Sequence, residues 1–270
     1  MPEDYIHGYS QAEQDRLLTQ GRTLAPFHHR KIDLAGRRRV LEIGCGVGSQ
    51  LHLLREKYPE AHLTGVDIAP ENIARASQFL KADIATGQID LHTADAAALP
   101  FPENAFDAIV IVFVLEHIPD PLPVIREAHR VLAPGGVIYC TEVVNSQVYI
   151  HPPAPIFPPY WDEFNRLQQE YGCDTDIGMR LGTLFYKAGF RDLDLYDASV
   201  YMDARNRDID FRHRLTENWI GVFMSAAETL IERGRVSESV RESIPAIFWD
   251  RFENMDAVVS YGCRQIRGVK

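Results

Sequence analysis

Three glycines at alternate positions and a carboxylate further along the chain are spaced as in a nucleoside-binding site. Gly44, Gly46 and Gly48 directly follow a short apolar segment that contains Glu42. Asp67 ends a second short apolar segment nineteen positions after Gly48. Glycines let the backbone turn sharply and approach a ligand closely, and a carboxylate at the next strand's end can accept hydrogen bonds from both ribose hydroxyls. The spacing therefore predicts a nucleoside site built on a strand, a glycine-rich turn, a helix and a second strand.

The position of Glu42 indicates the charge of the ligand. The glycine pattern differs from the G-x-G-x-x-G of dinucleotide sites, in which a helix N-terminus binds a pyrophosphate. A carboxylate beside the turn disfavours a phosphate and suits a ligand with positive charge and an amino group. We therefore expect a cationic nucleoside here and do not expect NAD.

The same residues resemble the first motif of the class I S-adenosylmethionine-dependent methyltransferases. Further matches follow in that family's order at residues 65–68, 94–96 with 99–101, 106–110, 115–118 and 130–136. The resemblance is close over residues 36–145 and is greatest to the small-molecule branch that includes ubiquinone and menaquinone methyltransferases. It implies S-adenosylmethionine as cofactor and S-adenosylhomocysteine as product. It also implies an α/β fold, with a Rossmann-like, doubly wound, seven-stranded and mostly parallel sheet.

The resemblance also implies roles for the residues of the first two motifs. Glu42, Cys45 and the backbone of the three glycines would surround the methionine part of the cofactor. Asp67 would hold the ribose, and Ile68 would pack on the adenine. The alternatives are a tight turn that binds no ligand and a surface carboxylate at a strand end.

Four further residues complete the cofactor shell that the resemblance implies. Asp95 would accept a hydrogen bond from the adenine amino group beside the Ala96 amide, or it caps a short helix. Asn72 would reach the cofactor's edge, or it lies on a helix surface. Phe113 and Val114, near the end of the fourth strand, would form the floor below the methyl-bearing sulfur, since open α/β sheets bind ligands at the carboxyl ends of their strands.

Chains of this branch often fold a leading helix over the cofactor. Tyr9 would then close on the methionine carboxylate, and Gln14 would assist it. The alternative is that both residues only dock the helix against the rest of the chain.

Methyl transfer is an in-line displacement that depends mainly on positioning and on exclusion of water. A base is needed only if the acceptor is protonated, and His117 is the candidate because it follows the fourth strand and titrates near neutrality. Glu142 and Asn145, after the fifth strand, are further candidates for catalysis. Each of the three could instead have a purely structural role.

Aromatic and polar residues that follow the fifth strand are candidates for binding the acceptor. They are His117, Asn145, Tyr149, His151, Tyr160 and Trp161. Aromatic rings suit an apolar or cationic acceptor, although packing is the alternative for every one of them. Two rival functions keep the cofactor: displacement or cyclisation chemistry other than methyl transfer, and a non-catalytic regulatory module.

Hydrophobic patterning predicts the elements that position these residues. We expect helices at 10–30, from 49 to 58, at 70–82, 120–132 and 176–188, and over 206–253 with breaks near Gly234 and Pro245. Strands are expected at 39–43, 62–67, 88–93, 109–115, 137–144, 192–202 and 258–269. The proline- and aromatic-rich segment 145–162 predicts neither a helix nor a strand. We divide the chain into a helical cap (1–35), a cofactor-binding core (36–145), a substrate-covering segment (146–190) and C-terminal strands with a helical and aromatic lid (191–270).

Composition limits the partners and the compartment. The formal net charge of −10 over 270 residues argues against nucleic acid, whose binding needs clustered Lys and Arg. Four scattered cysteines without a C-x-x-C pair, and dispersed histidines, predict neither a disulfide framework nor a metal site. The N-terminus has no apolar signal segment, and the longest apolar run is too short to span a bilayer. We expect a cytoplasmic protein that acts on a small molecule, with a homodimer as an option.

Overall fold

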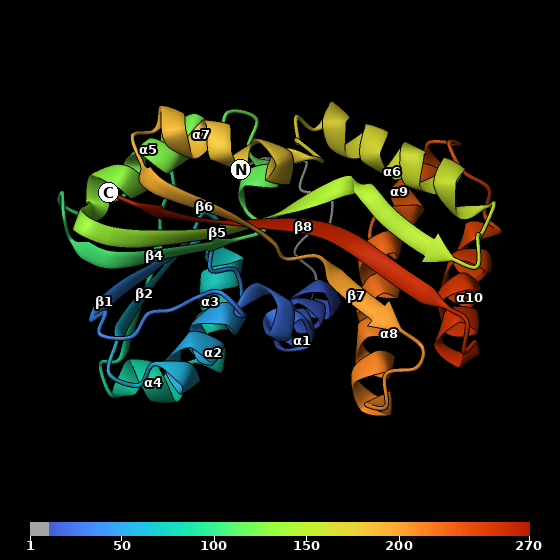
Figure 1. Ribbon diagram of the computed structural model, residues 1–270, viewed down its shortest axis with the longest axis horizontal. Coiled ribbons are helices and arrows are strands. Elements are labelled where there is room, and N and C mark those ends of the chain that lie inside the picture. The colour runs from blue at the N-terminus through green and yellow to red at the C-terminus, as the bar shows by residue number, and fades with distance from the viewer. Residues whose placement is uncertain (1–10) are drawn as a thin grey trace.

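The computed structural model describes residues 11–270, whose strands form one mixed sheet (Figure 1). The strand order is β3-β2-β1-β4-β5-β8-β6, and β7 pairs with the remaining part of β8. The first five strands of the chain run parallel, whereas β8 is antiparallel to β5, β6 and β7. The strands are β1 Arg39–Ile43, β2 His62–Asp67, β3 Ile89–Thr93, β4 Phe106–Val112, β5 Leu132–His151, β6 Arg191–Asp197, β7 Val200–Asp203 and β8 Val258–Val269.

The predicted α/β fold is confirmed, with eight strands among residues 11–270 where seven were expected. The additional strand arises because the segment 192–202 forms two strands, β6 and β7, rather than one. Between them the Asp197 carboxylate accepts hydrogen bonds from the Ser199 backbone N–H at 2.9 Å and from its hydroxyl at 2.5 Å. This local turn redirects the chain toward the far part of β8.

The central strand β4 is buried on both faces. Ile109 and Ile111 pack into the core on one side of the sheet, and Ala108, Val110 and Val112 pack into the core on the other. Such alternation follows from the two-residue period of a strand. The strand ends at Val112, three residues earlier than predicted.

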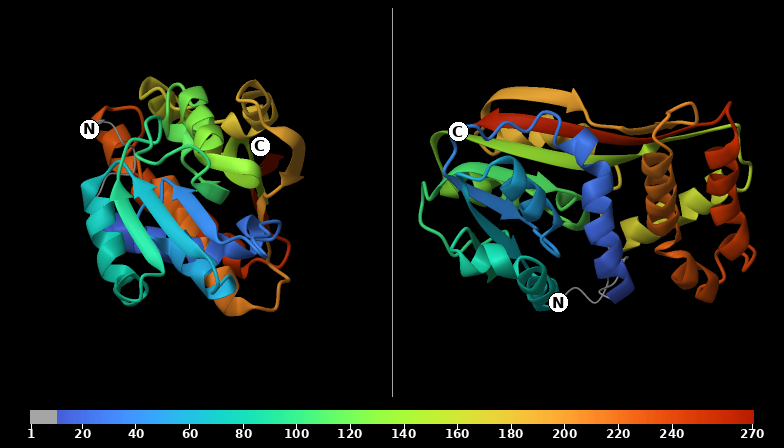
Figure 2. Two further views of the ribbon diagram at one scale, coloured as in Figure 1. Left: turned by 90° about the vertical axis from the view of Figure 1, so that its left-hand side faces the viewer. Right: turned by 90° about the horizontal axis from the view of Figure 1, so that it is seen from below.

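Helices cover both faces of the parallel part of the sheet (Figures 1 and 2). The core on one face includes buried residues of α5 and α7, and the core on the other includes buried residues of α2. The helices in the first half of the chain are α1 Gln11–His28, α2 Ser49–Lys57, α3 Pro70–Phe79, α4 Lys81–Ala85 and α5 Leu122–Val131. Those in the second half are α6 Phe157–Glu170, α7 Leu181–Lys187, α8 Ile209–Met224, α9 Ala227–Glu232 and α10 Val240–Glu253, with short 3-10 turns η1 Leu115–His117 and η2 Ile177–Arg180.

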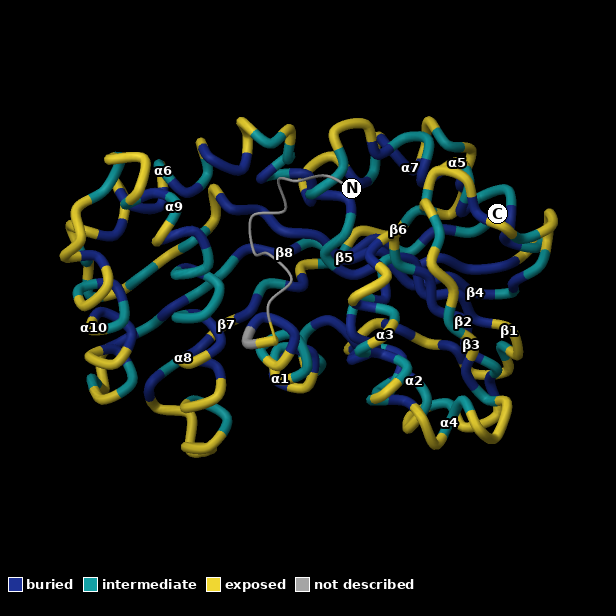
Figure 3. Tube along the Cα trace, turned by 180° about the vertical axis from the view of Figure 1, so that it is seen from behind, coloured by how far each residue is buried: buried dark blue, intermediate teal, exposed yellow. Residues whose placement is uncertain are grey.

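A second body of structure extends beyond this core. The far parts of β5 and β8, together with β7, continue past the parallel strands, and α6, α8, α9 and α10 pack on them (Figure 2, right). We call this the C-terminal extension. It has its own core, which is rich in aromatic side chains, including Phe164, Trp219, Phe223 and Phe248. The tube view shows buried backbone running through this part as well as through the sheet (Figure 3).

Two predictions about prolines were wrong. The segment 145–162 is regular: β5 continues to His151, and α6 starts at Phe157 with Pro158 and Pro159 in its first turn. Proline is tolerated there because the first N–H groups of a helix have no partner within the helix. Pro245 also lies inside α10 instead of breaking it, whereas Gly234 ends a helix as expected, in a left-handed conformation with φ 65°.

Candidate functional site

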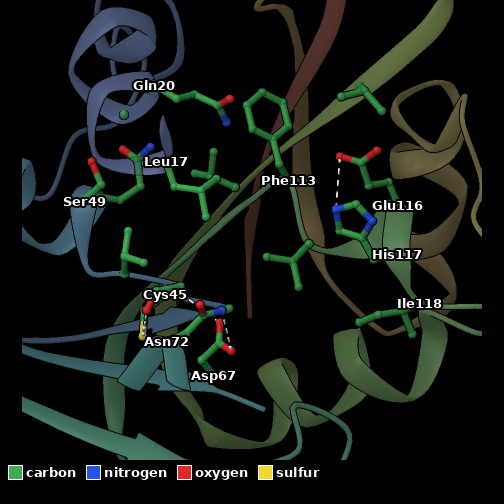
Figure 4. A pocket seen from close by; sticks show the side chains of 18 of the residues that line it. Leu17, Gln20, Cys45, Ser49, Asp67, Asn72, Phe113, Glu116, His117 and Ile118 are labelled. Carbon is green, nitrogen blue, oxygen red and sulfur yellow. Dashed lines mark hydrogen bonds and ion pairs between the residues drawn. The ribbon is translucent and has the colours of Figure 1, made fainter. Parts of the chain in front are cut away.

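A cavity of about 590 Å³ opens at the carboxyl ends of β1, β2 and β4 (Figure 4). The strand order reverses between β1 and β4, which is where open α/β sheets bind ligands. One end of the cavity, the glycine end, is lined by residues of the β1, β2 and β3 turns: Glu42, Gly44, Cys45, Gly46, Val47, Asp67, Ile68, Asn72, Asp95 and Ala96. The other end, the lid end, is lined from η1 and the C-terminal extension by Phe113, Glu116, His117, Asn145, Phe164, Gln168, Tyr171, Cys173, Asn218, Trp219 and Tyr261.

The glycine turn depends on conformations that only glycine adopts easily. Gly44, Gly46 and Gly48 have φ values of 71°, 51° and 84°. A Cβ atom at Gly44 would lie 2.3 Å from a methyl group of Val114, whereas one at Gly46 would have open space. The turn therefore brings bare backbone to the cavity at Gly44 and Gly46, whereas Gly48 does not line it. The contact of this backbone with the methionine part of a cofactor stays a prediction.

Asp67 is held in place by the turn that it faces. Its carboxylate accepts hydrogen bonds from the backbone N–H of Gly46 at 2.8 Å and of Ala69 at 2.9 Å, and from the Asn72 amide at 3.3 Å. Burial raises the pKa of Asp67, and these hydrogen bonds partly oppose the rise. The side chain is half-buried and lines the cavity, so it can accept further hydrogen bonds from a ligand.

Glu42 provides a test of whether a cationic ligand fits. Its side chain is buried and lines the cavity, and its Oε2 atom has no hydrogen-bond partner. Burial, and then the negative charge of Asp67, raise the pKa of Glu42 well above its ordinary value. A buried carboxyl with an unmatched oxygen suits a ligand that brings positive charge and N–H donors. The glycine end therefore fits the methionine and ribose parts of S-adenosylmethionine.

The remaining residues predicted for the cofactor shell lie around the same end. Ile68 and Asp95 are exposed and line the cavity together with Ala96 and Asn72. The Asp95 carboxylate accepts a hydrogen bond from the Ala97 backbone N–H at 2.8 Å, so it also caps its own turn. Their contacts to a cofactor stay predictions.

The leading helix lies over the cavity, but through residues other than those predicted. Arg16, Leu17 and Gln20 of α1 line it (Figure 4), whereas Gln14 is buried away from it. The helix packs closely on α2, because a Cβ atom at Gly21 would overlap the Ser49 side chain. Tyr9 lies outside the described residues.

Phe113 marks the boundary between the two ends of the cavity. It is one of the few non-glycine residues of the described chain with positive φ, at 56°. Its backbone N–H still donates to the Thr141 carbonyl at 2.9 Å, and its ring contacts the His28 ring edge-on at 4.8 Å between centroids. Strained backbone of this kind is concentrated at functional sites. Here it ends β4 and turns the chain into η1.

Glu142 was predicted to be catalytic, but the structure places it behind the cavity. Its carboxylate accepts hydrogen bonds from the backbone N–H groups of Val114 at 3.0 Å, Leu115 at 2.7 Å and Glu116 at 3.4 Å. The side chain is fully buried and does not line the cavity. Glu142 therefore holds η1 in place, and contact with a reacting group is not open to it.

Glu116 and His117 lie side by side on the wall opposite the glycine end (Figure 4). The Glu116 Oε1 and His117 Nε2 atoms are 3.7 Å apart. Burial lowers the pKa of His117 to about 4, so the imidazole is neutral at pH 7 and a weak proton acceptor. Burial raises the pKa of Glu116. Of the two neighbours, the carboxyl group is better matched to proton transfer near neutrality.

Asn145 lines the cavity, but both ends of its amide are already bonded. Its Oδ1 accepts from the Tyr261 hydroxyl at 2.6 Å, and its Nδ2 donates to Asn165 at 2.7 Å and Gln168 at 3.0 Å. The Trp161 indole N–H donates to its backbone carbonyl at 2.9 Å. Asn145 is thus the hub of a polar network that joins β5, α6 and β8.

Four residues predicted to bind the acceptor do not reach the cavity. Tyr149 and His151 are exposed on the far part of β5. Tyr160 and Trp161 are buried in the core of the C-terminal extension, where the Tyr160 hydroxyl donates to the Phe223 carbonyl. Regular helix in α6 is the physical reason, because it turns these two rings into the core.

Residues to which no role was assigned from the sequence form much of the lid end. Glu116, Gln168, Asn218, Trp219 and Tyr261 come from four different elements. Glu116 alone had a readable signal, since it is an acidic residue that directly follows an apolar strand. The others are distinguished only by tertiary packing.

Two kinds of feature are absent from the described residues. Within residues 11–270, no group of three or more His, Cys, Asp or Glu side chains is placed to bind a metal ion. No helix in the same range has both the length and the apolar character that crossing a bilayer requires.

Comparison with known proteins agrees with this geometry. Residues 41–140 match the methyltransferase domain family. The chain is 30% identical over 165 residues to demethylmenaquinone methyltransferase of Listeria monocytogenes, which covers 56% of this chain and 69% of that protein. It is 37% identical over 131 residues to the protein of the same name from Thermus thermophilus, covering 47% of this chain and 58% of that one.

Among solved structures, the fold is similar to that of a phosphoethanolamine N-methyltransferase 2 of Haemonchus contortus in complex with phosphomonomethylethanolamine and S-adenosylhomocysteine. The TM-score is 0.57 at 18% sequence identity, and the match covers 93% of this chain and 52% of that chain. At this identity the likeness concerns the fold.

Proposed function

The chain belongs to the class I S-adenosylmethionine-dependent methyltransferases, and we propose that its acceptor is a small molecule with a hydroxylated unsaturated ring. The observation that carries this proposal is the continuity of the cavity. It runs from the glycine end into a lid end lined by aromatic rings and polar groups. The similarity to demethylmenaquinone methyltransferases supports a ring of the quinone type.

The residues of the glycine end would hold the cofactor. Asp67 would accept hydrogen bonds from the ribose, and Glu42 would face the positively charged methionine part. When bound, S-adenosylmethionine supplies a methyl group on a positively charged sulfur. Among the described residues that line the cavity, four carry a carboxyl group, and Arg16 is the one Lys or Arg. The Arg16 guanidinium already donates hydrogen bonds to the Glu13 carboxylate at 2.6 and 2.7 Å. This charge balance favours a cation in the cavity.

The lid end would hold the acceptor and exclude water. Five aromatic rings line it: Phe113 just after β4, Phe164 in α6, Tyr171 just after α6, Trp219 in α8 and Tyr261 in β8. Flat apolar walls suit a planar ring, and a dry site strengthens every polar contact made by the reacting groups. Positioning the acceptor against the methyl group is the main contribution that the protein makes.

We further propose that the protein works in the cytoplasm, in a biosynthetic step, without a nucleic-acid or membrane-embedded partner. The four cysteines are unpaired, in keeping with a reducing compartment. The net charge of −10 disfavours binding to phosphate backbones. Self-association into a homodimer stays a prediction.

Calorimetric titration with S-adenosylmethionine, S-adenosylhomocysteine and NAD tests the cofactor assignment. We expect both sulfur nucleosides to bind and NAD not to bind. Asp67→Ala should weaken both by about 100-fold, since hydrogen bonds to charged groups contribute about 1.5–3 kcal/mol each. Asp90→Ala, an exposed carboxylate on the neighbouring strand β3, is the matched control and should bind like the wild type. Equal binding by Asp67→Ala and the wild type would contradict the assignment.

Product analysis then tests the reaction. The wild-type protein is incubated with S-adenosylmethionine and 1,4-naphthalenediol or catechol, and the products are identified by mass. S-Adenosylhomocysteine together with a methylated diol supports the proposal. Methylthioadenosine would indicate attack on the aminobutyrate chain of the cofactor instead. Cofactor binding without methylation of either diol would reject the acceptor class.

A further inference from the structure

Glu116 is the one acidic side chain among the described residues that line the lid end of the cavity. It lies in η1, three residues after the left-handed Phe113, and its side chain is 8% exposed. In Figure 4 its carboxylate lies across the cavity from Asp67, so a ligand held at the glycine end would have Glu116 on its far side. Burying a carboxyl group in this way lowers the stability of the fold, so we expect it to have a function.

A hydrogen-bond network that ends at Gln168 lies behind Glu116. The Tyr261 hydroxyl donates to Asn145 Oδ1 at 2.6 Å, and Asn145 Nδ2 donates to Gln168 Oε1 at 3.0 Å. Gln168 lies beside Glu116 and lowers the pKa of that carboxyl group, against the effect of burial. Because the Gln168 oxygen accepts from Asn145, its amide nitrogen is the polar atom left to interact with Glu116. This interaction favours the ionised carboxylate, the form in which Glu116 can take a proton from a ligand.

Several titratable groups face Glu116, but none of them both lines the cavity and titrates near neutral pH. They are Glu142 from β5, Cys173 from the segment after α6, Tyr261 and Cys263 from β8, and His117 from η1 itself. Burial raises the pKa of the two thiols and of the tyrosine, which stay neutral. Glu142 titrates behind the wall, out of contact with the cavity.

We propose that Glu116 is the general base of the reaction and accepts the proton of a ring hydroxyl of the acceptor, an assignment that rests on the proposed function. The ionised Glu116 carboxylate forms an O–H bond as the acceptor's O–H bond breaks, and the electron pair stays on the acceptor. That electron density forms the new bond to the methyl carbon. The carbon–sulfur bond breaks with its electron pair remaining on sulfur, and Glu116 later releases its proton to water.

His117 is then a neighbour of the base and not the base itself. Its imidazole is neutral, and its Nε2 atom lies 3.7 Å from the carboxylate, too far for a direct hydrogen bond in this conformation. This assignment differs from the sequence-based expectation, in which His117 was the base. The difference comes from burial, which weakens an imidazole as a proton acceptor and strengthens a carboxylate.

The test is the pH profile of methyl transfer to 1,4-naphthalenediol by the wild type, Glu116→Gln and His117→Asn. Since the base must be ionised, wild-type turnover should fall as the pH decreases through the raised pKa of Glu116. Glu116→Gln should lower turnover by about 10²–10⁴-fold, the usual contribution of a general base, and remove this acidic limb. His117→Asn should keep the limb. Glu60→Gln, an exposed carboxyl far along the surface, should behave as the wild type.

Two further measurements separate a base from a structural carboxyl. Binding of S-adenosylhomocysteine to Glu116→Gln should stay within about twofold of wild type, because the change lies at the lid end. Glu116→Asp, which keeps a titrating group, should keep the acidic limb at lower turnover. The proposal would be overturned if Glu116→Gln turned over as fast as the wild type. It would also be overturned if His117→Asn lost the acidic limb of the pH profile while Glu116→Gln kept it. Failure of the wild type to methylate the diol would instead count against the acceptor class.

Discussion

The two ends of the cavity are built in different ways. The glycine end comes from one continuous stretch of chain, in which three successive strands each contribute a turn. Its polar contacts are made largely by backbone, such as the N–H groups of Gly46 and Ala69 that bind Asp67. The lid end comes from η1, β5, α6, α8 and β8, which are far apart in sequence, and its contacts are made by side chains.

This difference determines how each end of the cavity responds to substitution. A backbone site tolerates change in most side chains, provided that glycines stand where φ is positive. A side-chain site depends on every element that supplies a residue, so a change in α6 or α8 can alter it without affecting the other end. We therefore expect variants at the two ends to affect cofactor binding and acceptor turnover separately.

The largest expected effect is at Gly44. Gly44→Ala combines a left-handed backbone, at a cost of about 1–2 kcal/mol, with overlap onto Val114, at a further cost of about 1–3 kcal/mol. Gly46→Ala incurs only the first cost, because its surroundings are open. Urea denaturation should therefore show a larger loss in the free energy of unfolding for Gly44→Ala.

A double variant sharpens this prediction. Val114→Ala removes the methyl groups that a Cβ atom at position 44 would meet. The double variant Gly44→Ala/Val114→Ala should therefore recover part of the lost stability relative to the sum of the two single changes. Equal losses for Gly44→Ala and Gly46→Ala would mean that the close approach to Val114 is unimportant.

An intermediate effect is expected at Asn145 in the lid end. Asn145→Ala leaves the Tyr261 hydroxyl and the Gln168 amide without their partner. Each unsatisfied buried group costs about 1–3 kcal/mol, so the free energy of unfolding should fall by roughly 2–4 kcal/mol. Turnover should fall with it, whereas calorimetry should show S-adenosylhomocysteine binding within about twofold of wild type.

Asn206→Ala provides the matched comparison for that change. Its side chain accepts one hydrogen bond, from the Asp208 backbone N–H, on an exposed loop. A change there should alter stability by about 0.5 kcal/mol or less. If Asn145→Ala abolished cofactor binding as well as turnover, the two ends of the cavity would not be separable.

The contrast also explains which parts of the site were predictable from sequence. The glycine end is encoded locally: glycine spacing, a strand end and a carboxylate are all visible in a short window. The strands of the parallel sheet were likewise recognisable from apolar runs bounded by turns. At the lid end, Tyr160 and Trp161 were expected in the cavity because prolines were taken to prevent a helix. Pro158 and Pro159 instead start α6 and turn both rings into the core.

The roles of the carboxyl groups could not be predicted for a related reason. Glu142 and Glu116 are similar in sequence context, since each lies near the end of a strand predicted from the sequence. Tertiary packing distinguishes them: three backbone N–H groups bind Glu142 behind the wall, and Glu116 lines the cavity. Burial likewise decides that His117 is a poor base, and burial is a property of the folded chain.

The smallest expected effect of a single substitution is at His28, at the boundary between the two ends, because it changes stability only in acid. His28 is the last residue of α1 and His29 follows it. His28 packs on Phe113, and neither of its ring nitrogens is hydrogen-bonded. Burial lowers the pKa of His28 to about 3 and that of His29 to about 4. Well above pH 6.5 both are neutral in the folded and the unfolded state, so they reduce stability only as the pH falls through the unfolded-state pKa of 6.5. There the unfolded chain takes up protons that the folded chain does not, and stability falls with pH.

By pH 5 each histidine should reduce the free energy of unfolding by about 2 kcal/mol, at 1.36 kcal/mol per pH unit of difference. His28→Phe keeps an aromatic ring against Phe113 and removes one titrating group. Its unfolding free energy, measured by urea denaturation, should therefore decline less steeply than that of the wild type between pH 7 and pH 5. His213→Phe, on an exposed part of α8, should leave the slope unchanged. Parallel curves for the wild type and His28→Phe would mean that His28 takes up its proton in the folded state as readily as in the unfolded state.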